Sequence, residues 1–535
     1  MKKLSTSLCV LALTLLSTGL FAQTRTFKEV SSEIQTQLNV IKQDNQLVGY
    51  LAFTKLEKSS SDSFSYKITI MDENLNDIGV VNFKELSLDL QGVAFESDMI
   101  CLAYTRKPVI LTDPKTKAKE FEDAREKYKK DIGIFFQFIT LNGVITKTDI
   151  IQEDFLYLSS TTLYSKKGEV LTNLRKGLQI QNIKDKGFAV YYGRGNNRDN
   201  KLVFYGIDGK RGWQKKLPNF ENYVLQVATT GIHVLGQPNS RKDVYSLPTT
   251  EACNELLTYN ITDGELLKPI KLRDPKQNTL NILAFRTNPE TGRLNILGQV
   301  INPDTKYYPY TYKSYKKKPF IGIFSMDFQG MDKQEIKTKY SFFNVDDKGE
   351  IFDEKFRLAS TDTKNYLVFN EAFLDSKGNA YFGANRIQQK TRVGTVVSSV
   401  VTLPIFVVPI FLGSLVGYTK FRQVEGQVLM QKSDGSTSLQ SDLPSDYSTS
   451  YNFRIPYVPE KDFKYVKGLS GEDYFLFTDA KQLSVYNVAK QKVMRTISLK
   501  DGKESLKIFP AKQGYLMIQQ YNSKEKSTQL SIEAL

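Results

Sequence analysis

Histidine, tryptophan and cysteine are almost missing from this chain of 535 residues, which contains one, one and three of them. With His233 as the only imidazole, Ser-His-Asp or Cys-His catalysis would have to rest on that single ring, and a zinc site built from several histidines is excluded. No phosphate-binding or dinucleotide-binding glycine motif is present, because GRGNNR at Gly193–Arg198 is typical of a hairpin turn. We therefore expect no cofactor, no metal, and a binding role rather than catalysis.

A secretory signal peptide is predicted at Met1–Ala22. Lys2 and Lys3 supply its positive start and Leu8–Leu16 its apolar centre, which is too short to span a bilayer comfortably. We expect cleavage after Ala22. Residues 23–535 should then be exported, to the periplasm or to an outer-membrane-associated or extracellular position.

The exported part is basic and poor in cysteine. Loss of Lys2 and Lys3 lowers the formal charge from +15 to +13, and a positive surface favours anionic partners such as acidic glycans or phosphorylated lipid head groups. Export makes nucleic acid an unexpected partner. Cys101 and Cys253 remain, and we expect two free thiols, although a disulfide is possible outside the cytoplasm.

The exported part repeats one pattern, in which an apolar strand, a turn rich in Asp, Asn and Gly, and a more polar return strand follow each other. The copies are separated by 70, 66, 55, 64, 107 and 53 residues, with about four strand candidates in each unit. This period in an all-strand chain is typical of a β-propeller, so we predict one all-β domain over residues 23–535 with about seven four-stranded blades. A pair of β-sandwich domains is the alternative. The turn residues that mark the copies are Asp72, Asn142, Asp208, Asp263, Asp327, Asp434 and Asn487.

Two further patterns support a ring. DSKGNAYFGANRI, which begins at Asp375, resembles propeller blades in having a tight Asp-Lys-Gly turn before a strand. The resemblance is to secreted β-propeller-like proteins of unknown function. It covers most of the exported chain, implies the architecture alone and names no enzyme family. The chain also ends in strand pattern at Gln513–Leu535, which suits a last sheet completed by strands from both ends of the chain.

One segment outside the repeat reads as a helix. In residues 113–130, Asp113 can cap a helix, Pro114 suits its first turn, and apolar positions mark one face. We predict a short surface helix inserted in a loop.

A second segment, Lys306–Lys318, is the leading candidate for a binding surface and is called the Tyr/Lys segment below. Aromatic faces can stack on sugar rings while ammonium groups meet carboxylates or phosphates, so the mixture suits an acidic glycan or a lipid head group. The alternative is a long loop whose tyrosines lie against the blade beneath. The candidate binding residues are Tyr307, Tyr308, Tyr310, Tyr312, Tyr315, Lys313, Lys316, Lys317 and Lys318.

A third segment, Val393–Thr419, has no charged residue and is called the apolar segment below. Its length would allow a membrane span, but Pro404 and Pro409 interrupt it and strand pattern continues on both sides. We predict an apolar hairpin or loop that is either buried on the ring or in contact with a membrane or partner. The candidate contact residues are Leu403, Ile405, Phe406, Ile410, Phe411 and Leu412.

Together these patterns predict an exported, non-catalytic binding or scaffolding protein of the cell envelope. Its partner would be an acidic glycan, a membrane surface or an envelope protein. The alternative is a carboxylate-dependent carbohydrate-active enzyme built on a propeller, which would need two carboxylates facing across a cleft. Many carboxylates are available, Glu350, Asp353 and Glu354 among them, but no spacing selects a pair.

Overall fold

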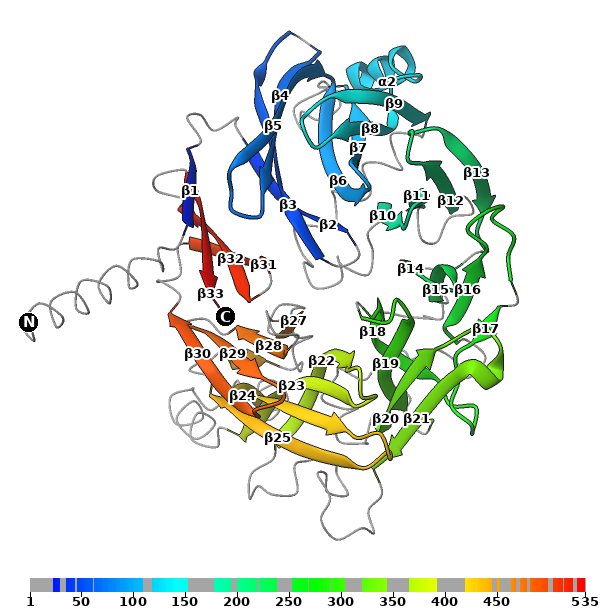
Figure 1. Cartoon of the computed structure of the whole chain (residues 1–535), viewed down its shortest axis with the longest axis vertical. Coiled ribbons are helices and arrows are strands. Elements are labelled where there is room, and N and C mark those ends of the chain that lie inside the picture. Colours follow the sequence, from blue (N-terminus) through cyan, green and yellow to red (C-terminus); the bar gives the residue numbers. More distant parts are fainter. Residues whose placement is uncertain are drawn as a thin grey trace, which may run out of the picture.

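The chain forms a ring of eight antiparallel β-sheets of four strands each, with one extra strand on the sixth (Figure 1). The predicted all-β propeller is therefore confirmed. The computed structural model describes residues 23–28, 35–43, 46–60, 62–108, 118–152, 178–193, 200–218, 220, 222–237, 253–267, 269–288, 290–303, 320–343, 365–391, 419–444, 450–452, 463–467, 472–478, 482–498, 504–512, 514–522 and 527–534.

Each sheet is one blade, and its strands follow the chain from the axis outward. Figure 1 shows the first strands of the blades gathered around the centre and the fourth strands at the rim. The first four blades comprise β2 (Gln35–Gln43), β3 (Gln46–Lys58), β4 (Phe64–Asp72) and β5 (Asp77–Glu85); β6 (Ser87–Glu96), β7 (Met99–Lys107), β8 (Gly133–Thr140) and β9 (Ile145–Gln152); β10 (Leu178–Ile183), β11 (Gly187–Tyr192), β12 (Lys201–Gly206) and β13 (Arg211–Lys216); and β14 (Asn222–Ala228), β15 (Gly231–Gln237), β16 (Glu255–Tyr259) and β17 (Ile270–Lys271).

The other half of the ring is built in the same way, except that the last blade takes its outer strand from the beginning of the chain. Blades 5 to 8 comprise β18 (Leu280–Thr287), β19 (Leu294–Ile301), β20 (Phe320–Phe328) and β21 (Ile336–Phe342); β22 (Asn365–Leu374), β23 (Ala380–Thr391), β24 (Thr419–Gln431) and β25 (Thr437–Pro444), with β26 (Ser450–Asn452) beside β24; β27 (Phe463–Lys467), β28 (Asp473–Thr478), β29 (Gln482–Asn487) and β30 (Lys492–Ser498); and β31 (Glu504–Pro510), β32 (Tyr515–Asn522), β33 (Ser527–Ala534) and β1 (Gln23–Lys28).

The blade number predicted from the sequence is wrong by one, and β1 explains the difference. In seven blades a hairpin joins the third and fourth strands, and every turn residue used for counting lies on that third strand or in the turn after it. In blade 8 the third strand is β33, near the end of the chain, and the fourth is β1, near its start, paired over all six residues. No hairpin marks this blade, so counting hairpins gives seven.

The core lies between blades rather than within them. Eight clusters of buried apolar side chains are present, each formed by two neighbouring blades. Between blades 1 and 2, for example, the ring of Phe53 lies 5.3 Å from the rings of both Tyr66 and Tyr104. Because a single four-stranded sheet cannot bury both of its faces alone, stacking around the axis supplies the burial.

Helical structure is scarce in the described part of the chain. The predicted surface helix is observed as α2 (Ala118–Lys127), shorter than residues 113–130, and residues 109–117 lie outside the described set. Ala124 and Tyr128 contact the core between blades 2 and 3. A 3-10 turn, η4 (Lys333–Glu335), precedes β21. Within the described residues, no helix is long and apolar enough to cross a membrane.

The ring has two faces of different character. One face, called the turn face, carries the connections from first to second and from third to fourth strands, and none of these between described strands exceeds ten residues. Hydrogen bonds join turns of neighbouring blades there, such as Thr229 N to Gly292 O (3.0 Å) and Lys512 Nζ to Asn74 Oδ1 (2.7 Å). The opposite loop face carries the second-to-third and blade-to-blade connections, and seven of them exceed 15 residues.

Candidate functional site

Both segments predicted to make contacts belong to the loop face. The Tyr/Lys segment lies in the connection from β19 to β20 of blade 5, and the apolar segment in the connection from β23 to β24 of blade 6. Apart from Thr419, which begins β24, these segments lie outside the described residues, so the structure tests none of their individual roles. The candidate residues concerned are Tyr307, Tyr308, Tyr310, Tyr312, Tyr315, Lys313, Lys316, Lys317, Lys318, Leu403, Ile405, Phe406, Ile410, Phe411 and Leu412.

The attachment points of the two segments are equivalent positions on adjacent blades. Ile301 and Phe320 are paired across β19 and β20, and Thr391 and Thr419 are paired across β23 and β24. The four residues are therefore at the loop-face ends of second and third strands. Sequence alone separates the two segments by 75 residues or more, whereas the topology begins both on one side of the ring.

The hairpin of β23 and β24 extends beyond the rest of blade 6. These strands are 12 and 13 residues long. The part of β24 from Glu425 to Gln431 pairs with β25, and the part from Lys420 to Arg422 pairs with β26. At the base of the extension, Arg386 and Glu425 form an ion pair of 2.8 Å with side chains only 18% and 15% exposed. The extension that leads to the apolar segment is thus a built element of the blade.

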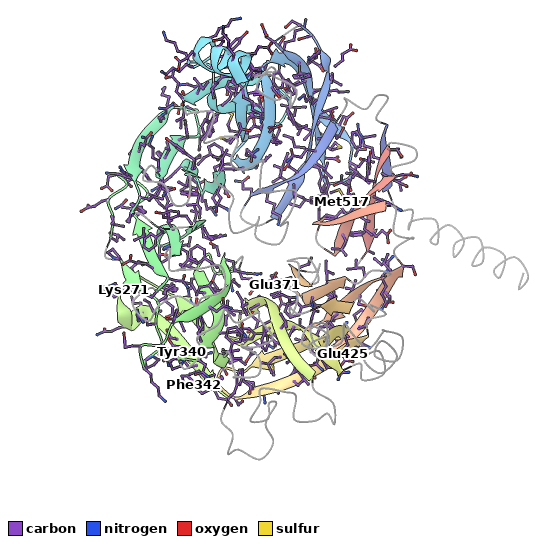
Figure 2. All side chains as sticks on the ribbon, turned by 180° about the vertical axis from the view of Figure 1, so that it is seen from behind. Lys271, Tyr340, Phe342, Glu371, Glu425 and Met517 are labelled. Carbon is purple, nitrogen blue, oxygen red and sulfur yellow. The ribbon has the colours of Figure 1, made fainter. Side chains whose placement is uncertain are left out.

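Charged side chains near the axis are paired with each other. Glu371 lies beside the central opening in Figure 2 and forms an ion pair with Arg286 of blade 5. The Arg286 guanidinium lies 5.9 Å from the ring centre of Tyr465 in blade 7, whose hydroxyl donates to Asp473 Oδ1 at 2.7 Å. Burial raises the pKa of Tyr465, so that hydroxyl stays protonated. This network links three successive blades, and its carboxylates are engaged in linking them.

The described structure gives the enzymatic alternative no positive support. Glu350, Asp353 and Glu354 lie outside the described residues. Within the described residues, no group of three or more His, Cys, Asp or Glu side chains could hold a metal ion.

An open depression of about 730 Å³ lies on the rim between blades 3 and 4. Lys215 and Lys216 border it on one side and Asp263 and Glu265 on the other, with Tyr259 and Leu266 between them. Both signs of charge are present, and the Asp263 carboxylate accepts from Glu265 N within its own turn (2.8 Å). The depression therefore shows no preference for a ligand of one charge.

His233 and the cysteines have structural positions. The His233 ring is fully buried, with Nε2 2.8 Å from Thr230 Oγ1 and Nδ1 2.9 Å from Thr258 Oγ1. Burial lowers the pKa of His233 to about 3, so the ring is neutral at physiological pH. Cys101 and Cys253 are buried free thiols, in agreement with the sequence-based expectation.

Sequence comparison adds a family without an assigned function. A model of the DUF6770 family of unknown function matches residues 1–132, which include blade 1 and the first two strands of blade 2. No curated protein matches the chain in sequence. The expected resemblance to propeller proteins outside the named enzyme families is therefore confirmed.

Similar solved structures include propellers of several kinds. The chain is 12% identical to dihydro-heme d1 dehydrogenase NirN, with a TM-score of 0.35 over 73% of this chain, and spans only 56% of that protein. It is 9% identical to the WD40 domain of SCAP from fission yeast (TM-score 0.37, 96% and 98% of the two chains) and 7% identical to the Dos1 propeller (TM-score 0.44, 95% and 94%). The fold assignment rests on the eight sheets themselves. Propeller folds commonly bind protein partners, but a fold does not fix a function.

Proposed function

We propose that this chain is an exported, non-catalytic binding or scaffolding protein of the cell envelope, which contacts its partner through the loop face. The observation that carries the proposal is topological: both segments with contact-type composition begin on the loop face of adjacent blades. The partner would be an acidic glycan, a membrane surface or an envelope protein.

The division between the faces supports this proposal. Hydrogen bonds between neighbouring blades occupy the turn face, so the short turns there hold the ring. Binding residues commonly lie on connections positioned by such a rigid scaffold. The extended hairpin of β23 and β24 adds a second support, because an element with its own extra strand projects toward the apolar segment. The basic composition favours an anionic partner surface.

The experiment removes the apolar segment without disturbing the strands that carry it. Because Thr391 and Thr419 are a cross-strand pair, residues 392–418 can be replaced by Asn-Gly, which favours a two-residue hairpin turn. The shortened protein should fold, remain soluble and no longer fractionate with membranes or a partner. A control carries a Gly/Ser segment of the original length in the same place and should behave like the shortened protein. Unchanged fractionation of both variants would contradict the proposal.

A further inference from the structure

One exposed aromatic ring distinguishes the loop face within the described residues. Among the exposed large apolar side chains there, Phe342 is the only aromatic one, with 36% of its surface accessible. It is the last residue of β21, at the loop-face end of an outer strand. The others lie in third-to-fourth connections or within the first four residues of the strands that follow: Ile78, Val80, Val144, Ile145, Leu266, Leu267 and Met494.

Phe342 is part of an ordered arrangement. Its ring stacks on that of Tyr340, with centres 6.0 Å apart and planes inclined by 15°. Lys276 Nζ lies 5.7 Å from the Phe342 ring centre, and the Tyr340 hydroxyl donates to Arg273 O at 3.2 Å. Burial, with the nearby Asp274 carboxylate, raises the pKa of Tyr340 to about 12, so this donor is retained at neutral pH. The ring pair is therefore held in place by the connection from β17 to β18, which belongs to the loop face.

The exposed charge around these rings is positive. Lys271 and Lys276 are exposed, and within the described residues neither has a carboxylate at ion-pair distance. Asp274 is 1% exposed, and its two oxygens accept from the backbone and side-chain nitrogens of Asn278 at 2.6 and 2.8 Å. Figure 2 shows Lys271, Tyr340 and Phe342 along the same stretch of the rim. The anion is thus buried and satisfied while the cations face solvent.

We propose that Tyr340, Phe342, Lys276 and Lys271, called the rim patch, bind an acidic polysaccharide. The exposed ring of Phe342 offers a flat face for a sugar ring, and the two ammonium groups stand beside it where carboxylates of the same polymer can reach them. An open rim accommodates an extended polymer, which needs no enclosed pocket. This inference rests on the proposed function, since it names the partner class of the loop face.

The test measures binding of the exported chain to polygalacturonate by isothermal titration calorimetry, with dextran as the neutral comparison. F342A should weaken binding about five- to tenfold, as expected for loss of one aromatic contact of about 1 to 1.4 kcal/mol. F342L, which keeps an apolar side chain, should behave like F342A, and K276Q should weaken binding about threefold. The matched control is M494A, because Met494 is 42% exposed and lies near the turn face. Thermal unfolding of all variants verifies that they remain folded.

Each outcome decides the inference. Weaker binding of F342A and F342L with unchanged M494A supports it. Equal affinity of all variants overturns it, as does a loss in K276Q alone, which would indicate charge attraction without stacking. Binding to phosphatidylglycerol vesicles with none to polygalacturonate also overturns it, in favour of a lipid surface. If polygalacturonate fails to bind while replacement of residues 392–418 still changes fractionation, the rim patch inference fails and the proposed function stands.

Discussion

The turn face and the loop face of the ring use the same strands for different ends. On the turn face, short connections with Asp, Asn and Gly return the chain at once, and polar groups from one blade bond to the next. On the loop face, the chain leaves the strands for long excursions that include both segments of contact-type composition. The comparison teaches that ring stability and partner contact are assigned to opposite sides. Changes to one face should therefore leave the property of the other nearly intact.

Glu96 shows how far the turn face is built for stability. Its side chain is completely buried at the end of β6. Its carboxylate accepts from Asn182 Nδ2 at 2.9 Å and Asp185 N at 3.0 Å in blade 3, and from Gln43 Nε2 at 3.4 Å in blade 1. Ser97 of its own turn donates as well, at 3.1 Å. One carboxylate thus holds the turns of three blades together.

The largest effect is expected from E96A. Removal of the carboxylate leaves several buried donors without an acceptor, so the free energy of unfolding should fall by about 3 kcal/mol. Urea unfolding followed by circular dichroism measures the change. The control is E57A, which removes an exposed carboxylate at the loop-face end of β3 and should cost less than about 0.5 kcal/mol. Equal losses in the two variants would break the distinction between the faces.

A smaller effect is expected from acid, through His233. The folded pKa of about 3 lies below the value of about 6.5 in the unfolded chain, so protons bind the unfolded state first as the pH falls. The contribution of His233 is full above pH 6.5 and is lost between pH 6.5 and about 3. At pH 5 it should have decreased by about 2 kcal/mol. H233Q cannot take up this proton, so its stability should vary less between pH 7 and 5; identical pH dependence of both proteins would show that His233 is not the group responsible.

A still smaller effect is expected where the two ends of the chain meet. Arg25 of β1 binds both carboxylate oxygens of Asp77 in blade 1, at 2.6 and 2.9 Å, and donates to Leu75 O at 2.9 Å. The Asp77 side chain is 47% exposed, so the ion pair is partly screened by solvent. R25A should lower the free energy of unfolding by about 1 kcal/mol. The double variant R25A/D77A should be less destabilised than the sum of the single variants, and simple additivity would exclude a role of this pair in closing the ring.

The ring could be predicted because its turns have a chemical signature. Asp208 and Asp434 each accept the backbone N–H two residues ahead, at 3.0 and 2.8 Å, and such carboxylate turns stand out in the sequence. The eighth blade carries no such turn, because β33 and β1 lie at opposite ends of the chain. The closing of the last sheet by both ends was nevertheless visible in the strand pattern of the final residues.

The rim patch could not be predicted in the same way. Tyr340 and Phe342 lie two apart on one strand, a spacing that indicates a buried face as readily as an exposed one. Their exposure is set by the place of β21 at the rim, and Lys276 is brought beside them from a connection 66 residues earlier. Composition therefore identified the Tyr/Lys segment, in which aromatic and basic residues are contiguous, and missed a patch assembled from two blades.

The smallest effect on stability is expected from the Tyr/Lys segment itself. Replacement of residues 306–318 by a Gly/Ser sequence of equal length keeps the pairing of Ile301 with Phe320, on which blade 5 depends. The free energy of unfolding should change by less than about 0.5 kcal/mol, because surface connections contribute few buried contacts. Binding to an anionic partner should weaken, and a charge-neutral Lys-to-Gln version of the same segment separates the contribution of its cations from that of its tyrosines. A loss of 2 kcal/mol or more would mean that the tyrosines lie against the blade beneath, and the loop face would then share the stabilising role assigned to the turns.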